Sequence, residues 1–359
     1  MHNNRIKKVL QQMKAQQINQ LLITSPASLY YLTSHWVHPG ERFLALYLNT
    51  EGEVVYFANE LFHLSPAIDC PIASYTDSQN PIDLLMKYLK DTGIIGVDNH
   101  FATNFLLDLI GRLNVGKITL ASNCINKVRM IKDKEEIKLL RESSQINDLT
   151  MNDIIPAVHP SLTELELSHK LPEFYCSHGG NGYLVDPIVS YGANCADAHH
   201  KPDQTKLSIG DSIVFDMGIP YKSYCSDMTR TVFFGDVSKK FESIYHIVLK
   251  AQLAASAAVK PGIRCCDIDK IGRDIIAAEG YGKFFTHRIG HNIGIEGHEF
   301  PSISANNEML LEEGMVFSVE PGIYIPNEGG VRIEDLVVVT ANGCEILNHH
   351  PKDLQIITV

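Results

Sequence analysis

Four acidic residues and one histidine lie in or beside apolar, strand-like runs of this sequence. Asp216 and Asp227 belong to the segment VFDMGIPYKSYCSDMTRTVFFG, which predicts two strands joined by a short turn. Glu320 ends the run GMVFSVE, Glu334 lies in GGVRIEDLVVV, and His291 lies in the glycine-rich segment THRIGHNIGIEGHEFP. A buried carboxylate without a partner is energetically costly, so these positions indicate a compensating charge.

The two aspartates raise the question most sharply. A hairpin closed around residues 220–223 would place Asp216 opposite Asp227, with Cβ atoms about 4.5–5.5 Å apart, and like charges there are destabilising. A shared proton, an arginine such as Arg230, or a divalent cation would compensate, and a cation does so best because carboxylate oxygens are hard ligands. The alternative is that Asp216 begins a turn and Asp227 is a solvated strand residue.

The glycine-rich segment contains three histidines, His287, His291 and His298. Its glycines allow the backbone to approach a ligand closely. A single histidine is more often a packed or surface residue, but three in one such segment favour a metal or catalytic role for at least one. Farther along, strand alternation predicts that Arg332 and Glu334 share one face. Taken singly, each acid could instead be an ion-paired structural residue.

Taken together, the four carboxylates and the imidazole can hold two divalent ions if some carboxylates bridge. Two such ions about 3.5–4 Å apart share a hydroxide, lower its pKa and polarise a carbonyl. Ligation rich in oxygen, with one imidazole and no thiolate, favours Mn²⁺ or a similar ion over a structural zinc site.

Bulk composition narrows the class of protein. With 359 residues and 45% hydrophobic residues, the chain predicts two domains of ordinary size. The formal charge of −11 argues against nucleic acid or an anionic membrane surface as a partner. No signal-like start and no apolar run near about 20 residues is present, so we expect a soluble, cytoplasmic protein. The 8 cysteines show no CxxC spacing, which predicts reduced thiols.

The order of helical and strand patterns predicts an α+β protein with two parts. Residues 1–124 alternate short helices and strands, as a modest α/β domain does, and carry no phosphate loop or paired catalytic groups. The charged, amphipathic run after residue 129 predicts a helix opening a second domain, residues 125–359. Further helices are expected near residues 163–176, 241–259 and 267–279, interleaved with paired strands.

At this point the motifs resemble a known family. The order D…D…H…E…E, with FDMGIPYKSYCSDMTRT, HRIGHNIGIEGHEFPSI, GMVFSVEPGIYIP and GVRIEDLVVV, strongly resembles the pita-bread metallopeptidases: prolidase, aminopeptidase P and methionine aminopeptidase. YYLTSHWVHPGERFLALYL and YTDSQNPIDLL resemble the N-terminal domain of bacterial Xaa-Pro dipeptidases more weakly. The large leading domain disfavours a methionine aminopeptidase. The presence of all five ligand positions disfavours a creatinase-like enzyme.

The resemblance implies a creatinase/prolidase-like domain over residues 1–124, a pita-bread catalytic domain over residues 125–359, and roles for the five ligands. Asp216 would chelate one ion, Asp227 and Glu334 would bridge both, and His291 and Glu320 would hold the second. The ions would be Mn²⁺, with Co²⁺ or Zn²⁺ as alternatives.

The resemblance also implies residues that contact the substrate. His199, in NCADAHHKP, matches a histidine on the substrate side, although Ala198 replaces the usual proline and leaves the register against His200 open. His298 would contact the scissile carbonyl. Arg332 would grip the carboxylate of a C-terminal proline by a forked hydrogen bond.

The implied activity is hydrolysis of the peptide bond before proline in Xaa-Pro dipeptides, with Glu320 shuttling a proton to the leaving nitrogen. Aminopeptidase P, acting on longer peptides, is the alternative within this chemistry, and a non-catalytic binding module is the alternative outside it. The resemblance also implies a homodimer. In it, His38 and Arg42 of SHWVHPGERF would help close the pocket, unless this is an ordinary exposed loop. Asn292 stands where the family has glycine, and we expect the loop to tolerate it with a local change.

Overall fold

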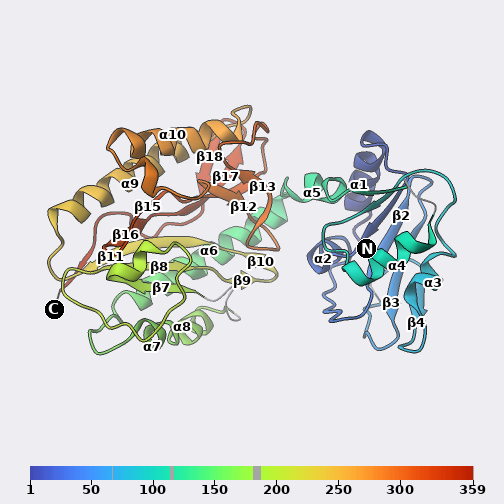
Figure 1. Cartoon of the computed structure of the whole chain (residues 1–359), viewed down its shortest axis with the longest axis horizontal. Helices are drawn as coiled ribbons and strands as arrows, with labels where there is room; N and C mark the ends of the chain where they lie inside the picture. Colours follow the sequence, from blue (N-terminus) through green and yellow to red (C-terminus); the bar gives the residue numbers. More distant parts are fainter. Residues whose placement is uncertain (67, 114–116, 181–186, 359) are drawn as a thin grey trace. The chain divides into compact units, whose positions relative to one another are not determined.

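The computed structural model describes residues 1–66, 68–113, 117–180 and 187–358 (Figure 1). The chain divides into two compact units, Met1–Arg129 and Met130–Val359. The division expected between residues 124 and 125 lies within helix α5 (Asn123–Arg129), the last helix of the first unit. Among the described residues, no helix combines the length and apolar character that crossing a lipid bilayer requires.

The first unit is built on one six-stranded sheet with the order β4-β3-β2-β1-β5-β6. Strands β1, β2 and β3 pair antiparallel, while β4, β5 and β6 join in parallel. The strands are β1 (Gln20–Ile23), β2 (Ala45–Asn49), β3 (Val54–Asn59), β4 (Ile72–Tyr75), β5 (Ile95–Val97) and β6 (Ile118–Leu120). The helices besides α5 are α1 (Asn3–Ala15), α2 (Pro26–Thr33), α3 (Pro81–Leu85) and α4 (Thr103–Arg112). This mixed sheet with helices confirms the predicted α/β character.

The run PIDLLMKYLKDTG forms helix α3 only over its first residues, Pro81–Leu85. Beyond the helix, the buried side chain of Gln20 fixes the backbone, because its Oε1 accepts a hydrogen bond from the Lys90 amide at 2.7 Å and its Nε2 donates to the Lys90 carbonyl at 3.1 Å. These bonds attach the turn that precedes β5 to β1.

The second unit contains two larger sheets, with the orders β19-β11-β8-β7 and β13-β12-β14-β17-β18. The first comprises β7 (Ile188–Tyr191), β8 (Ser212–Met217), β11 (Met228–Phe234) and β19 (Ile356–Ile357). The second comprises β12 (Gly290–Asn292), β13 (Glu299–Ile303), β14 (Val316–Val319), β17 (Asp335–Thr340) and β18 (Gly343–Ile346). Two short hairpins extend them: β9 (Pro220–Tyr221) with β10 (Tyr224–Cys225), and β15 (Gly322–Ile325) with β16 (Gly329–Arg332).

Helices cover these sheets in two groups (Figure 1). Helices α6 (Lys134–Ile154), α7 (Glu164–Ser168) and α8 (Leu171–Ser177) pack with β7, β8 and β11 in one apolar core. Helices α9 (Lys239–Ala257) and α10 (Cys265–Ala278) pack in another core with β13, β14 and β17. Short 3₁₀ turns, η1 (Gly192–Ala196) and η2 (Gly282–Phe284), complete the unit. The expected helix over residues 163–176 is therefore two helices, and Pro172 lies in the first turn of the second, where its missing N–H costs nothing.

The register of the hairpin that carries the two aspartates corrects the prediction made from the sequence. Asp216 pairs with Thr229, two residues beyond Asp227. The turn is centred on Lys222 and Ser223, whose φ values are 47° and 70°, as a two-residue hairpin turn requires. A shift by two residues keeps side chains on the same face, so Asp216 and Asp227 remain diagonal neighbours.

Gly290 allows two strands of the second sheet to approach closely. A Cβ atom at this position would lie 1.8 Å from the backbone oxygen of Ser318, whereas a Cβ at Gly343 would meet nothing within 4 Å. We expect Gly290→Ala to lower the free energy of unfolding by about 1–3 kcal/mol or more, because backbone cannot move aside as a flexible side chain can. The matched change Gly343→Ala is expected to stay within about 0.5 kcal/mol of wild type. Urea unfolding of the two variants measures this, and equal stability would contradict the close approach.

Candidate metal centre and active site

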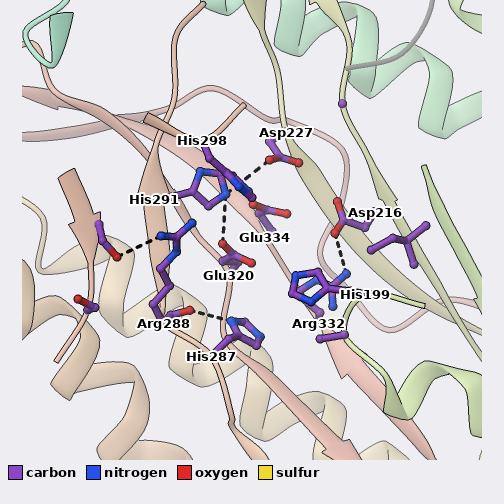
Figure 2. A pocket seen from close by; sticks show the side chains of 15 residues that line it. His199, Asp216, Asp227, His287, Arg288, His291, His298, Glu320, Arg332 and Glu334 are labelled. Carbon is purple, nitrogen blue, oxygen red and sulfur yellow. Dashed lines mark hydrogen bonds and ion pairs between the residues drawn. The ribbon is translucent and has the colours of Figure 1, made fainter. Parts of the chain in front are cut away.

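A cavity of about 550 Å³ in the second unit collects most of the residues that the sequence singled out. Figure 2 shows their side chains turned toward one another from several strands. The lining includes all five predicted metal ligands and three predicted substrate contacts: Asp216, Asp227, His291, Glu320, Glu334, His199, His298 and Arg332. His287 and Arg288 lie there as well.

The acids reach this cavity from the ends of strands. Asp216 is on β8, Asp227 immediately precedes β11, Glu320 immediately follows β14, and Glu334 immediately precedes β17. Their neighbours in sequence point into the apolar cores, as Phe215, Met217 and Met228 do, because successive strand residues face opposite ways. The two sheets thus bring to one place carboxylates that are up to 118 residues apart in the chain.

Burial and mutual repulsion make this cluster costly when it is ionised. Ligand atoms of Asp227, His291 and Glu334 all lie within 4.8 Å of one another. Burial raises the pKa of Asp227 well above its usual value, and the charges of Asp216 and Glu320 raise it further. Burial and the charge of Asp227 do the same to the pKa of Glu334, despite a hydrogen bond from the Thr229 hydroxyl at 2.7 Å. The cluster therefore favours any bound positive charge.

His291 faces these acids in the form that a metal ligand needs. Its Nδ1 lies 3.3 Å from the carbonyl oxygen of Asn292, which fixes the proton on that nitrogen. Its Nε2 lies 3.3 Å from Glu320 Oε1 and 3.7 Å from Asp227 Oδ2. Burial lowers the pKa of His291 well below its usual value, so the ring is neutral. A lone pair and two carboxylates facing one another form a donor set that suits a divalent cation.

Glu320 differs from the other acids in the pKa it reaches. Burial is the main cause that raises its pKa to about 7, with Arg332 acting in the opposite direction. The Ser318 hydroxyl donates a hydrogen bond to Glu320 Oε1 at 3.1 Å. A carboxyl group with this pKa can accept and release a proton near neutral pH.

Arg332 is the cation that neutralises part of this cluster. It is buried, and its Nη2 donates to Asp216 Oδ2 at 2.7 Å while its Nε donates to Thr229 Oγ1 at 3.1 Å. Burial lowers the pKa of the guanidinium, but Tyr324, Asp216 and Glu320 together raise it well above its usual value. Arg230, considered from the sequence as a partner for the aspartates, instead binds Asp335 at 2.8 Å and the Glu334 carbonyl at 2.6 Å.

Tyr324 is a site residue that the sequence did not reveal. Arg332 Nη1 donates to its hydroxyl at 2.9 Å, and the hydroxyl lies 2.8 Å from His287 Nε2. Since His287 Nδ1 is 2.7 Å from the Arg288 carbonyl, the tyrosine donates to Nε2 of a neutral ring, whose pKa burial lowers to about 4. The chain His287–Tyr324–Arg332–Asp216 fixes the orientation of the arginine. No local pattern marks Tyr324, because its partner is 37 residues away.

The structure separates the two adjacent histidines whose register was open. His199 lines the cavity, whereas His200 points to Glu164, with 2.7 Å between Nε2 and Oε2. His298 lies beside the metal-ligand candidate His291, with ring centroids 4.0 Å apart, and burial is the main cause that lowers its pKa. His199 and His298 thus place two imidazoles on the wall of the cavity that holds the acid cluster.

The predicted loop residues belong to the first unit. Arg42 makes two hydrogen bonds of 2.8 Å to the carboxylate of Asp77, and the ring of His38 lies 6.0 Å from that of Trp36. Their part in substrate binding stays a prediction.

Asn292 occupies an extended strand position and not a left-handed one. It lies on β12, next to a register irregularity, and its Nδ2 donates to the Phe300 carbonyl at 2.9 Å. Its side chain is fully buried, and its Oδ1 has no hydrogen-bond partner among the described residues. The expected tolerance therefore comes from a side-chain bond to the β13 segment rather than from unusual backbone angles.

Comparisons with known proteins agree with this geometry. Residues 138–341 match Metallopeptidase family M24, and residues 5–131 match the Creatinase/Prolidase N-terminal domain. An uncharacterized peptidase of Staphylococcus aureus (strain USA300) is 35% identical over 97% of this chain and 99% of its own.

Two solved structures extend the likeness over both units. A dipeptidase from Pyrococcus horikoshii OT3 is 35% identical, with a TM-score of 0.91 over 98% of this chain and 100% of its own. A Xaa-Pro dipeptidase from Bacillus anthracis is 30% identical, with a TM-score of 0.91 over 99% and 100% of the two chains. The pita-bread fold expected from the sequence is thereby confirmed.

Five metal-ligand candidates line one cavity, and these relatives match nearly the whole length of the chain. The chain is therefore a metallopeptidase that belongs to family M24 and has a creatinase/prolidase N-terminal domain.

Proposed function

We propose that this metallopeptidase hydrolyses the peptide bond before proline, with Xaa-Pro dipeptides as its main substrates. The observation that carries the proposal is the cavity in which an acid cluster adjoins the buried guanidinium of Arg332. A positive group on the cavity wall beside the acid cluster suits a substrate whose free carboxylate lies close to the scissile bond. The similarity to a Xaa-Pro dipeptidase supports the same substrate class.

The donor set fits divalent ions. Four carboxylates and an imidazole meet in one cavity, and burial and mutual repulsion keep the pKa values of Asp227 and Glu334 well above their usual values, although the charge of Arg332 lowers that of Asp227. We propose two ions, Mn²⁺ in preference to Co²⁺ or Zn²⁺, with Asp216, Asp227, His291, Glu320 and Glu334 as ligands. Bound there, they would lower the pKa of a water molecule and polarise the substrate carbonyl.

The protein's own groups would perform the remaining tasks. Glu320 would take a proton from the attacking water and deliver it to the nitrogen of the leaving proline. His199 and His298, both on the cavity wall, would orient the peptide and donate hydrogen bonds to its carbonyl oxygen as negative charge develops.

Arg332 has N–H groups left for a substrate. A guanidinium has five N–H donors, and those directed at Thr229, Tyr324 and Asp216 account for three. The remaining two would bind the proline carboxylate, provided that the substrate ends there. The homodimer and cytoplasmic location expected from the resemblance also stay predictions.

A peptide panel tests the proposed substrate. After dialysis against EDTA and reconstitution with Mn²⁺, we expect cleavage of Ala-Pro. Ala-Pro-Ala should be cleaved roughly tenfold or more slowly, because its carboxylate lies one residue farther from the scissile bond and cannot bind the two remaining N–H groups of Arg332. Ala-Ala serves as the control for the proline requirement. Release of the products is followed by chromatography.

Each other outcome of the panel points to a specific alternative. Equal or faster cleavage of Ala-Pro-Ala would replace the dipeptidase with an aminopeptidase P. Activity that is indifferent to EDTA would contradict the metal. Absence of Mn²⁺ binding in equilibrium dialysis, together with no cleavage, would indicate a binding module.

Glu320→Gln tests the proton transfer. The amide keeps the shape but cannot shuttle a proton, so we expect kcat to fall by about 10²–10⁴-fold in the reconstituted enzyme. Glu328→Gln is the matched control, because Glu328 forms an exposed pair with Lys240 on the same unit. Near-normal turnover of Glu320→Gln with Mn²⁺ bound would remove Glu320 from the mechanism.

The same substitution, which lowers activity, should raise the stability of the metal-free protein at neutral and alkaline pH. The pKa of Glu320 rises from 4.5 to about 7 on folding, so its contribution is complete below pH 4.5 and is lost as pH rises through 7. Neutral buried histidines produce the reverse trend below pH 6.5, so the informative quantity is the difference between variant and wild type.

We expect metal-free Glu320→Gln to match wild type near pH 4 and to exceed it at pH 8 by as much as about 3 kcal/mol. Thermal unfolding in EDTA at several pH values measures the difference. A difference that does not grow with pH would contradict the raised pKa.

A further inference from the structure

The two adjacent histidines of the AHHK segment have different partners. His199 lines the cavity, while the imidazole of His200 lies against Glu164, with 2.7 Å between Nε2 and Oε2. The Glu164 side chain is fully buried and that of His200 is 14% exposed. A carboxylate in this position is unusual enough to need an explanation.

Glu164 collects hydrogen bonds from the whole segment that surrounds His199. Its Oε1 accepts from the backbone N–H of Tyr191 at 2.7 Å and from the Asn194 side chain at 3.0 Å. Its Oε2 accepts from the backbone N–H of Asp203 at 3.0 Å as well as from His200. One carboxylate thus joins the end of β7, the η1 turn and the loop that follows it.

The backbone at His199 is otherwise fixed only to its near neighbours in the hydrogen bonds that the described residues make. The His199 amide donates to the Asp197 side chain at 2.9 Å, and the His200 amide donates to the Asp197 carbonyl at 3.2 Å. These bonds define a local turn but do not attach it to the rest of the unit. The imidazole of His200 provides that attachment beside His199.

Glu164 is itself held firmly. It is the first residue of α7, and Thr163 and Glu166 close that helix with a capping box. Its own amide donates to the Thr205 carbonyl at 3.1 Å, so the far end of the loop is tied to the same point. The anchor is therefore rigid compared with the loop.

A bound cation does not explain this cluster as well. Ligand atoms of Glu164, His200 and Asp203 lie within 4.8 Å of one another. However, both oxygens of Glu164 already accept hydrogen bonds from N–H groups, and Asp203 Oδ1 accepts from the Thr205 amide at 2.7 Å. A cation would have to displace these donors, whereas a hydrogen-bonded anchor satisfies them all.

We infer that the Glu164–His200 pair is a positioning device that holds His199 at its place on the cavity wall. The inference rests on the proposed function, in which His199 orients the peptide and donates to its carbonyl oxygen. Glu164 and His200 act through His199 and touch no reacting atom. A displacement of about 1 Å in such a group costs up to about 10²-fold in rate.

A double-mutant cycle tests the inference, with the peptide that the wild-type enzyme cleaves fastest as substrate. We expect His200→Ala to lower kcat/KM on the order of 10- to 100-fold in the wild-type background and less than about threefold in a His199→Ala background. His200→Gln, which retains an N–H donor for Glu164, should recover part of the loss. Equal losses in both backgrounds would overturn the inference, because general destabilisation does not depend on His199.

Amide hydrogen exchange supplies a readout that needs no activity. We expect His200→Ala to speed exchange in residues 192–205, while the control His178→Ala leaves that segment unchanged. The control removes a histidine–carboxylate pair of similar length, 2.6 Å to Asp153, elsewhere in the unit. Unchanged exchange in His200→Ala would also overturn the inference.

The two proposals fail separately. A wild-type enzyme that cleaves no peptide before proline would refute the proposed function, while exchange would still report on the anchor. An active wild type with an additive cycle would refute the anchor alone.

Discussion

The repulsion among buried carboxylates is the constraint on which the rest of this structure depends. Asp216, Asp227, Glu320 and Glu334 share one cavity, and burial strengthens every interaction among them. Arg332 offsets part of their charge but binds only Asp216 directly. Such a cluster persists only where the packing and hydrogen bonds of the surrounding strands hold the carboxylates together. The same repulsion favours the binding of cations, on which the proposed chemistry depends.

A second buried charge network, centred on Arg230 and Asp335, supports these strands. Arg230 binds Asp335 and is almost completely buried, with a relative exposure of 2%. It also donates to the backbone carbonyls of Glu334 and His350. The segment near the C-terminus is thereby tied to the strand that presents Glu334, and breaking such a buried pair typically costs about 3–5 kcal/mol.

The sequence predicted the membership of the site better than its geometry. Acids inside apolar runs are conspicuous because burial there is costly, so all five ligand candidates could be named, and they line one cavity. The hairpin register was wrong by two residues because Lys222 and Ser223 adopt positive φ, which neither residue type signals. The roles of Tyr324, which contacts His287, and of Arg332, which takes the place considered for Arg230 beside Asp216, depend on contacts between distant segments, which no local pattern encodes.

At three places in this unit, one residue faces the cavity and the next residue in the sequence makes a buried contact that supports it. Glu334 faces the cavity while Asp335 binds Arg230, and His199 faces it while His200 binds Glu164. His298 follows the same rule, because the adjacent Glu299 pairs with buried Lys132 at 3.3 Å and accepts hydrogen bonds from the amides of residues 295 and 296. A supporting contact placed one residue away, beside a strand as at Glu334–Asp335 or in a turn as at His199–His200, can control the position of a functional side chain without occupying the cavity. Substitution at such supports would therefore change the rate of the reaction without removing any group that contacts the substrate.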